Sequence, residues 1–99
     1  MTTLYVVPAA LDEADDANLW WRANRLSAPD LFEDELRAAF RDLLEHPQLG
    51  RPYPTPPYPD TRRSEMPRTR YAVYYRFDEA RDHIDVVAIW STRRGRGPF

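Results

Sequence analysis

Apolar and polar residues alternate most regularly in the last third of the chain, in two segments joined by a short polar link. In the first segment, Tyr71, Val73, Tyr75 and Phe77 alternate with Arg70, Ala72, Tyr74 and Arg76. In the second, Ile84, Val86, Ala88 and Trp90 alternate with Asp85, Val87, Ile89 and Ser91. A period of two is that of a β-strand, and the short link over residues 78–83 predicts an antiparallel hairpin.

The register of this hairpin follows from its apolar residues, because a slip by one position would send core side chains to solvent. Placing Phe77 opposite Ile84 brings Arg76 opposite Asp85, a favourable charge pair across the strands. The same register pairs Tyr75 with Val86, Val73 with Ala88 and Tyr71 with Trp90. The other face, which carries Ala72, Tyr74, Val87 and Ile89, is too apolar for plain exposure. Either the first strand, a proline-rich loop or self-association covers that face, or a partner protein docks on it.

Apolar residues at three- and four-residue steps predict two helices in the first half of the chain. The first helix has one apolar side of Ala10, Ala14, Ala17 and Trp21, with Trp20 and Trp21 filling space at its far end. Its early acids, Asp12, Glu13, Asp15 and Asp16, are interpreted as a solvated helix start in preference to a metal site. The second helix is expected to start at Ser27-Ala-Pro-Asp30 and to end at His46-Pro47. Its apolar face comprises Phe32, Leu36, Phe40 and Leu43 or Leu44, and the short link makes the two helices an antiparallel α-hairpin.

Prolines and β-branched residues complete the outline. The segment Thr3–Val7 predicts a first strand, and a proline ends it. Residues 47–67 hold seven of the ten prolines, so residues 47–60 are interpreted as a stiff connector. This interpretation is preferred to a ligand motif with P-x-x-P spacing at Pro54–Pro57 or Pro56–Pro59. A short strand over Arg62–Met66 is expected to follow.

The composition fits a single small domain. With 99 residues, 42% of them hydrophobic, the chain has material for one core and not for two. The expected fold is one α+β domain over residues 1–99, with an N-terminal strand and an antiparallel α-hairpin packed on one face of a small, mainly antiparallel β-sheet. The absence of cysteine fits a reducing compartment, and the N-terminus lacks the features of a secretory signal, so we expect a cytoplasmic location.

Charge is distributed unevenly along the chain. Residues 1–50 hold four arginines and ten acids, whereas residues 51–99 hold ten arginines and six acids, which gives net charges of −6 and +4. The basic tail over residues 91–99 leaves the same end of the hairpin at which the penultimate strand begins. We therefore expect one positive patch, suited to nucleic acid or to an acidic protein, made of Arg68, Arg70, Arg93, Arg94 and Arg96.

Three segments of the sequence resemble a known family. These are Leu43-Leu-Glu-His-Pro-Gln-Leu-Gly50, Pro67-Arg-Thr-Arg-Tyr-Ala-Val-Tyr-Tyr-Arg-Phe-Asp78 and Val86-Val-Ala-Ile-Trp-Ser-Thr-Arg-Arg-Gly-Arg-Gly-Pro98. In order and spacing they are similar to the RelE/ParE toxin superfamily, especially its ParE-like, plasmid-stabilisation branch. The resemblance implies a bacterial toxin of a type II toxin-antitoxin system, encoded beside an antitoxin that wraps and neutralises it. It also implies one of two targets, because RelE-like members cut mRNA in the ribosome and ParE-like members inhibit DNA gyrase.

The residues favour a binding toxin over a ribonuclease. RNA cleavage needs groups that take and give a proton beside the cations that hold the phosphate. The RelE-like pattern has a basic residue where this chain has Ala72, and relatives often have a histidine where it has Ser91. The two histidines, His46 and His83, are predicted to lie away from the arginines. No cofactor and no metal site are expected.

Gyrase inhibition is therefore the preferred prediction, with the five patch arginines as the target surface. The antitoxin is predicted to cover the helices and the second strand face, at Ala72, Tyr74, Arg76, Val87 and Ile89. Two alternatives stay open. One is a ribosome-dependent mRNA endonuclease, and the other is an inactive relative that only binds its antitoxin. The candidates for the nuclease chemistry would be Arg70, Tyr71, Tyr74 and Arg93.

Overall fold

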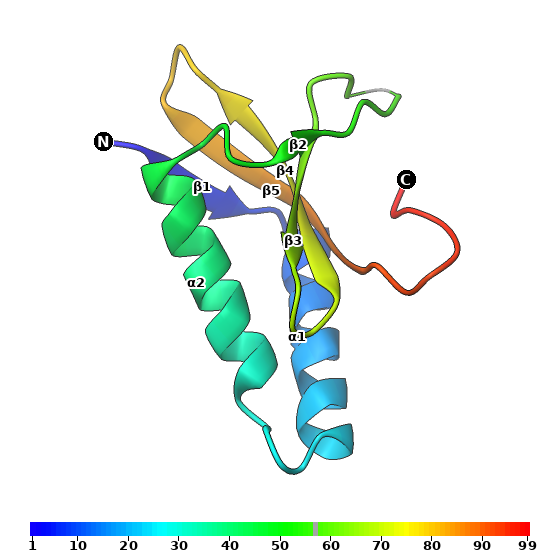
Figure 1. The fold of residues 1–99 in the computed structure, drawn as a ribbon. Coiled ribbons are helices and arrows are strands. Elements are labelled where there is room, and N and C mark those ends of the chain that lie inside the picture. Colours follow the sequence, from blue (N-terminus) through cyan, green and yellow to red (C-terminus); the bar gives the residue numbers. More distant parts are fainter. Residues whose placement is uncertain (57) are drawn as a thin grey trace.

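A computed structural model describes residues 1–56 and 58–99. In chain order the elements are β1 (Thr3–Val6), α1 (Pro8–Asn24), α2 (Leu31–Glu45), β2 (Arg51–Pro52), β3 (Arg62–Met66), β4 (Tyr71–Asp78) and β5 (His83–Ser91). The strands form one sheet in the order β1-β5-β4-β3-β2, in which β1 runs parallel to β5 and the other neighbours are antiparallel. The two helices lie side by side as a hairpin against this sheet (Figure 1). The α+β class and the mainly antiparallel sheet are as predicted.

The first helix packs on the sheet through the predicted small residues. Ala10, Ala14, Ala17 and Trp21 are all buried. Small side chains allow the helix backbone to lie close to β5, and Trp21 fills the wider space near the loop. Trp20, in contrast, is 46% exposed, so of the two tryptophans predicted to fill space at the far end of the helix only Trp21 is buried.

The second helix begins later than predicted, at Leu31, with Asp30 and not Ser27 as its N-cap. The indole N–H of Trp21 donates a hydrogen bond of 2.9 Å to the carbonyl oxygen of Ala28. The same oxygen accepts from the backbone N–H of Leu31, which closes a four-residue β-turn in place of a first turn of α-helix. These bonds hold Ser27 and its neighbours in a connecting turn. The predicted helix end is confirmed, with His46 as the C-cap.

The register of the β4–β5 hairpin is confirmed near its turn and wrong beyond Tyr75. Phe77 pairs with Ile84, and Arg76 lies opposite Asp85, as predicted. The predicted charge pair does not form, because Arg76 binds Asp60 and Asp85 binds His83. Between Tyr74 and Tyr75 the register shifts, because Val87 is an extra residue on β5. Val73 therefore lies opposite Ile89 and not Ala88, and Tyr71 lies opposite Ser91 and not Trp90.

This bulge exchanges the faces of the last residues of β5. Ile89 is 2% exposed and belongs to the main core beneath the helices, not to the second face where the strict alternation placed it. Ala88 and Trp90, which the strict alternation placed on the core face, instead pack with Ala72 and Tyr74 on the second face. A period of two cannot reveal an inserted residue, which is why the sequence pattern misplaced them.

The second face of the sheet is covered in part by the chain itself. Tyr53, from the proline-rich connector, packs edge-on against Tyr74 with 5.1 Å between ring centroids. Phe99, at the C-terminus, packs edge-on against the same ring at 5.9 Å. The alternative in which the proline-rich loop covers this face is thus confirmed for Tyr53, and the C-terminal residue is a cover that the sequence did not indicate.

The connector is less irregular than predicted. Arg51–Pro52 forms the two-residue strand β2, which pairs with the start of β3, and Thr55 forms an isolated bridge with Tyr58. The predicted strand over Arg62–Met66 is confirmed as β3. Pro57, which belongs to the Pro54–Pro57 spacing, lies outside the described residues.

Gly50 ends the link from α2 and lies against the ring of Tyr75. Its N–H donates to the hydroxyl oxygen of Tyr75 at 2.8 Å, and a Cβ on Gly50 would lie 2.7 Å from that oxygen and 3.0 Å from the carbonyl oxygen of Arg63. We expect Gly50→Ala to lower the free energy of unfolding by about 1–3 kcal/mol, because the buried ring and the strand backbone cannot both move aside. Urea unfolding measures this change. Gly95→Ala is the matched control, since nothing lies within 4 Å of its added Cβ, and an equal loss there would contradict the steric reason.

Candidate functional site

The predicted positive patch lies at one end of the sheet, where two chain segments meet. Tyr71 pairs with both Met66 on β3 and Ser91 on β5, so the β3–β4 turn and the C-terminal tail start at the same end. The backbone N–H and the hydroxyl of Thr92 both donate to the carbonyl oxygen of Arg70, at 2.8 and 3.0 Å. We name this end the arginine rim; it consists of the exposed residues Arg68, Arg70, Arg93, Arg94 and Arg96.

A carboxylate from α2 holds the turn that carries two of these arginines. Glu35 accepts hydrogen bonds from the backbone N–H groups of Arg68 (2.8 Å) and Thr69 (2.9 Å), and from the Thr69 hydroxyl (2.6 Å). Arg70 then adopts a positive φ of 62°, a strained conformation that its surroundings must maintain. The turn is therefore fixed from α2 and from Thr92. No pattern in the sequence singled out Glu35, because its partners are more than 30 residues away.

The basic tail is folded against Trp90 of β5. The guanidinium carbon of Arg94 lies 4.0 Å from the ring centroid of Trp90, and that of Arg96 lies 5.4 Å from it. The indole N–H of Trp90 donates to the carbonyl oxygen of Arg96 at 2.9 Å. The backbone N–H of Arg93 donates to the Ser91 hydroxyl oxygen at 3.2 Å.

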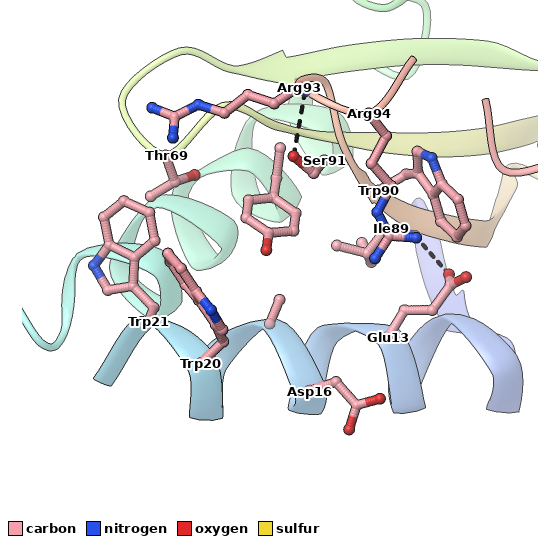
Figure 2. Close-up of a pocket in the computed structure, with 12 residues that line it drawn as sticks. Glu13, Asp16, Trp20, Trp21, Thr69, Ile89, Trp90, Ser91, Arg93 and Arg94 are labelled. Carbon is pink, nitrogen blue, oxygen red and sulfur yellow. Dashed lines mark hydrogen bonds between the residues drawn. The ribbon is translucent and has the colours of Figure 1, made fainter. Parts of the chain in front are cut away.

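A pocket of about 650 Å³ separates the rim from α1. Figure 2 shows Glu13, Asp16 and Trp20 on the helix wall, and Arg93 and Arg94 on the opposite wall. The remaining lining residues are Ala17, Trp21, Thr69, Tyr71, Ile89, Trp90 and Ser91. The pocket thus combines aromatic surface with carboxylates on one side and guanidinium groups on the other.

Glu13 is part of the fold and not only a solvated acid of the helix start. Its carboxylate accepts the backbone N–H of Ile89 at 3.0 Å, beyond the point where β1 stops pairing with β5. Burial raises the pKa of Glu13, while the bond from Ile89 and the charge of Arg94 oppose the rise. Within residues 1–56 and 58–99 no cluster of three or more potential metal ligands occurs.

The nuclease candidates are not all brought together. Arg70, Tyr71 and Arg93 lie at the rim, and Tyr71 lines the pocket while packing edge-on against Phe32 at 4.9 Å. Tyr74 lies on the second face, only 2% exposed, and burial raises the pKa of its hydroxyl. A buried phenol with a raised pKa is a weak proton donor near neutral pH.

The two histidines are remote from the rim. His83 lies at the hairpin turn, at the opposite end of β5, within hydrogen-bond distance of the Thr3 hydroxyl (2.7 Å) and of Asp85 (2.9 Å). His46 caps the end of α2. Ala72, at the position where the RelE-like pattern has a basic residue, is fully buried.

The residues predicted to bind an antitoxin lie in different surroundings. Ala72 and Tyr74 are buried on the second face, and Val87 packs beside them. Arg76 is bound to the carboxylate of Asp60, with a shortest N–O distance of 2.9 Å, and lies over the ring of Tyr58. Ile89 is in the main core. The part of this face that is open to a partner is therefore small while Tyr53 and Phe99 cover it.

A second recess, of about 320 Å³, lies between α1 and α2 on the side away from the rim. We name it the helix groove; it is lined by Val6, Leu11, Ala14, Asp15, Asn18, Phe32, Glu33, Leu36, Arg37 and Phe40. The side-chain oxygen of Asn18 is buried there and accepts no hydrogen bond from any described residue. Glu33 binds Arg22 and Arg37, and the bond from Arg22 lowers its pKa. The groove thus has an apolar floor and charged edges.

Two buried tyrosines give the fold an alkaline limit. Burial raises the pKa of Tyr74 and of Tyr75 above the usual value of about 10. Because the unfolded chain loses these protons first, the stability from both groups is complete below about pH 10 and is lost as the pH rises above it. Urea unfolding at pH values between about 8 and 11 should show this decline, and Tyr74→Phe should make it shallower. An unchanged slope in that variant would contradict the role of Tyr74.

Comparisons with known proteins agree on one family of folds. Residues 4–96 match the family model described as ParE toxin of type II toxin-antitoxin system, parDE. A search among curated proteins gives no match. Among solved structures, the chain is similar to one in the RelBE2 toxin-antitoxin complex from Mycobacterium tuberculosis (18% identity, TM-score 0.66, covering 91% of this chain and 96% of that one). It is also similar to one in the intact E. coli RelBE toxin-antitoxin complex (17% identity, TM-score 0.62, covering 95% and 100%). No helix in the described part of the chain is long and apolar enough to cross a membrane.

Proposed function

Because the chain belongs to the ParE toxin family of type II toxin-antitoxin systems, we propose that it stops growth by binding DNA gyrase through its arginine rim. In this proposal the chain acts in the cytoplasm as a binding inhibitor and not as an enzyme. A cognate antitoxin neutralises it by forming a toxin-antitoxin complex. The superfamily and the toxin class follow from the comparisons, and the target is the proposed step.

The observation that carries the proposal is the rim itself. Five exposed arginines lie on two segments that meet at one end of the sheet, a turn fixed by Glu35 and a tail fixed by Trp90. Arginine presents a planar, permanently charged fork that suits carboxylates and phosphates, and a rigid support lowers the entropy lost on binding. Among the described residues, no histidine lies beside Arg68, Arg70 or Arg93, and the carboxylates that share the pocket with Arg93, those of Glu13 and Asp16, are on its opposite wall. This arrangement is equipped for binding and poorly equipped for proton transfer.

A ribosome-dependent mRNA endonuclease is the second candidate, and one observation favours it. Tyr71 and Arg93 line the same pocket, next to the turn that carries Arg70. A tyrosine hydroxyl beside arginines has the groups needed to hold a phosphate and to donate a proton. The carboxylates of Glu13 and Asp16, on the opposite wall of this pocket, are the groups available to take the proton from the 2′-hydroxyl.

For the antitoxin, the helix groove is the surface that supports docking best. The second strand face around Ala72 and Tyr74 is partly occupied by Tyr53 and Phe99, so an antitoxin segment reaches it fully only by displacing them. The groove is unoccupied by the chain and has an apolar floor and charged edges. An amphipathic helix with an apolar side and charged flanks fits these features.

Inducible expression of the chain in a bacterial host tests the proposed target. We expect growth arrest with filamentation, continued translation, and inhibition of purified gyrase in a DNA supercoiling assay. Arrest of translation with mRNA cut at codons would instead establish the nuclease. Harmless expression of soluble, folded chain would identify an inactive relative that only binds its antitoxin.

A further inference from the structure

We propose that Trp90 is a positioning residue that divides the arginine rim into two sets. Arg94 and Arg96 anchor the tail, while Arg68, Arg70 and Arg93 contact the target. This inference deepens the proposed function and rests on it for the target-contacting set. The anchoring role of Trp90 rests only on the geometry of the tail.

The first observation is that Trp90 engages both anchors. A guanidinium within about 6 Å of an aromatic centroid is attracted to the ring face. Arg94 at 4.0 Å and Arg96 at 5.4 Å both satisfy this condition, and the indole N–H also holds the backbone of Arg96. One side chain therefore fixes two side chains and one carbonyl of a segment that has three arginines and two glycines. Without Trp90, the conformational freedom of glycine would leave that segment disordered.

The second observation is the path of the tail after Arg96. Gly97 passes so close to Tyr53 that a Cβ on it would lie 2.6 Å from the tyrosine hydroxyl oxygen. Phe99 then packs against Tyr74 on the second face. The tail thus turns from the rim toward the second face of the sheet. Arg94 and Arg96 lie on this turning segment, where their contacts with Trp90 determine its course.

The third observation is the different direction of Arg93. Figure 2 shows its side chain extending over Thr69, toward the turn that carries Arg68 and Arg70, while Arg94 turns to Trp90. Among residues 1–56 and 58–99, the guanidinium groups of Arg68, Arg70 and Arg93 form no ion pair, hydrogen bond or stacking contact. These three groups are exposed, close to the fixed turn and free for a partner's carboxylates or phosphates.

The main rival is that Arg94 itself contacts the target. Arg94 also lines the pocket, and its charge acts on Glu13. Under this rival interpretation the stacking on Trp90 is incidental, and removing Arg94 would weaken the target interaction without loosening the tail. The two interpretations therefore predict different results for Arg94→Ala: the proposal predicts loss of both tail order and activity, whereas the rival predicts loss of activity alone.

The experiment measures tail order and growth inhibition in parallel on the full chain. Tail order is read from backbone ¹⁵N heteronuclear NOE values over residues 93–99. We expect Trp90→Ala, Arg94→Ala and Arg96→Ala to lower these values to those of a mobile terminus. The same variants should reduce growth inhibition roughly tenfold, because a mobile tail no longer holds Arg93 beside the turn. Trp90→Phe keeps an aromatic ring but loses the indole N–H, so it should retain part of the tail order and part of the growth inhibition.

Two controls complete the design. Arg93→Ala should leave tail order unchanged while reducing growth inhibition at least as much as Arg94→Ala does. Trp20→Ala, at an exposed tryptophan of α1, should leave tail order unchanged. An ordered tail in Trp90→Ala, or normal tail order with lost activity in Arg94→Ala, would overturn the proposal. If the unmodified chain does not stop growth, the proposed function fails, whereas the NOE values still decide the role of Trp90.

Discussion

Growth inhibition should be lost when Arg68, Arg70 and Arg93 are all replaced by alanine, although the variant folds as the unmodified chain does. Each hydrogen bond between a guanidinium group and a charged partner contributes about 1.5–3 kcal/mol, so removing three weakens target binding on the order of a thousandfold or more. The fold should persist because only the backbone atoms of these residues bond to the rest of the chain. Gyrase supercoiling assays and growth curves measure the loss, and thermal unfolding checks the fold.

A second triple variant separates the rim from total charge. Arg41, Arg51 and Arg81 are also exposed and lie outside the rim. Replacing all three by alanine changes the net charge by the same amount as the rim triple does. Long-range attraction to an acidic target depends on net charge and weakens with salt, whereas contact at a defined surface depends on position. We expect the control triple to retain most of the growth inhibition. Equal losses in the two triples would show that charge in general, and not the rim, determines activity.

The second strand of the hairpin shows how far the residue pattern could predict the surface. Alternation placed Ile84 and Val86 correctly because pairing near the turn is regular. Beyond the bulge at Val87 the same rule assigned Ile89 and Trp90 to the wrong faces. A bulge is an inserted residue whose presence depends on packing against both sides of the strand, and the neighbours on both sides are remote in sequence.

The rim itself was predicted more accurately than its supports. Because paired strands bring distant turns together, the sequence was sufficient to place Arg70 beside the tail. It was not sufficient to identify Glu35, whose carboxylate binds a turn 33 and 34 residues further along the chain. Nor did it show that Trp90 holds the tail, since a glycine- and arginine-rich ending is typical of a flexible segment. Both supports arise from tertiary contacts between residues that have no local pattern in common.

Leu11→Glu is expected to produce a toxin that its antitoxin no longer neutralises. Leu11 lies in the helix groove and is 50% exposed, so the substitution leaves the core of the toxin intact. On docking, the new carboxylate would be buried next to Asp15, while the cation of the groove, Arg37, is already paired with Glu33. This costs several kcal/mol and lowers antitoxin affinity at least about a hundredfold. Calorimetric titration with the antitoxin encoded beside the chain measures the affinity, and co-expression measures neutralisation.

Leu26→Glu is the matched control for this prediction. Leu26 is 80% exposed in the link between the helices and does not line the groove, so the same change of residue adds the same charge outside the proposed contact. The control should bind the antitoxin normally, and both variants should still stop growth when expressed alone, because the groove and the rim lie on different sides of α1. Normal neutralisation of the Leu11 variant would place the antitoxin elsewhere. The second strand face, reached by displacing Phe99, would then be the surface to test by truncating the C-terminus.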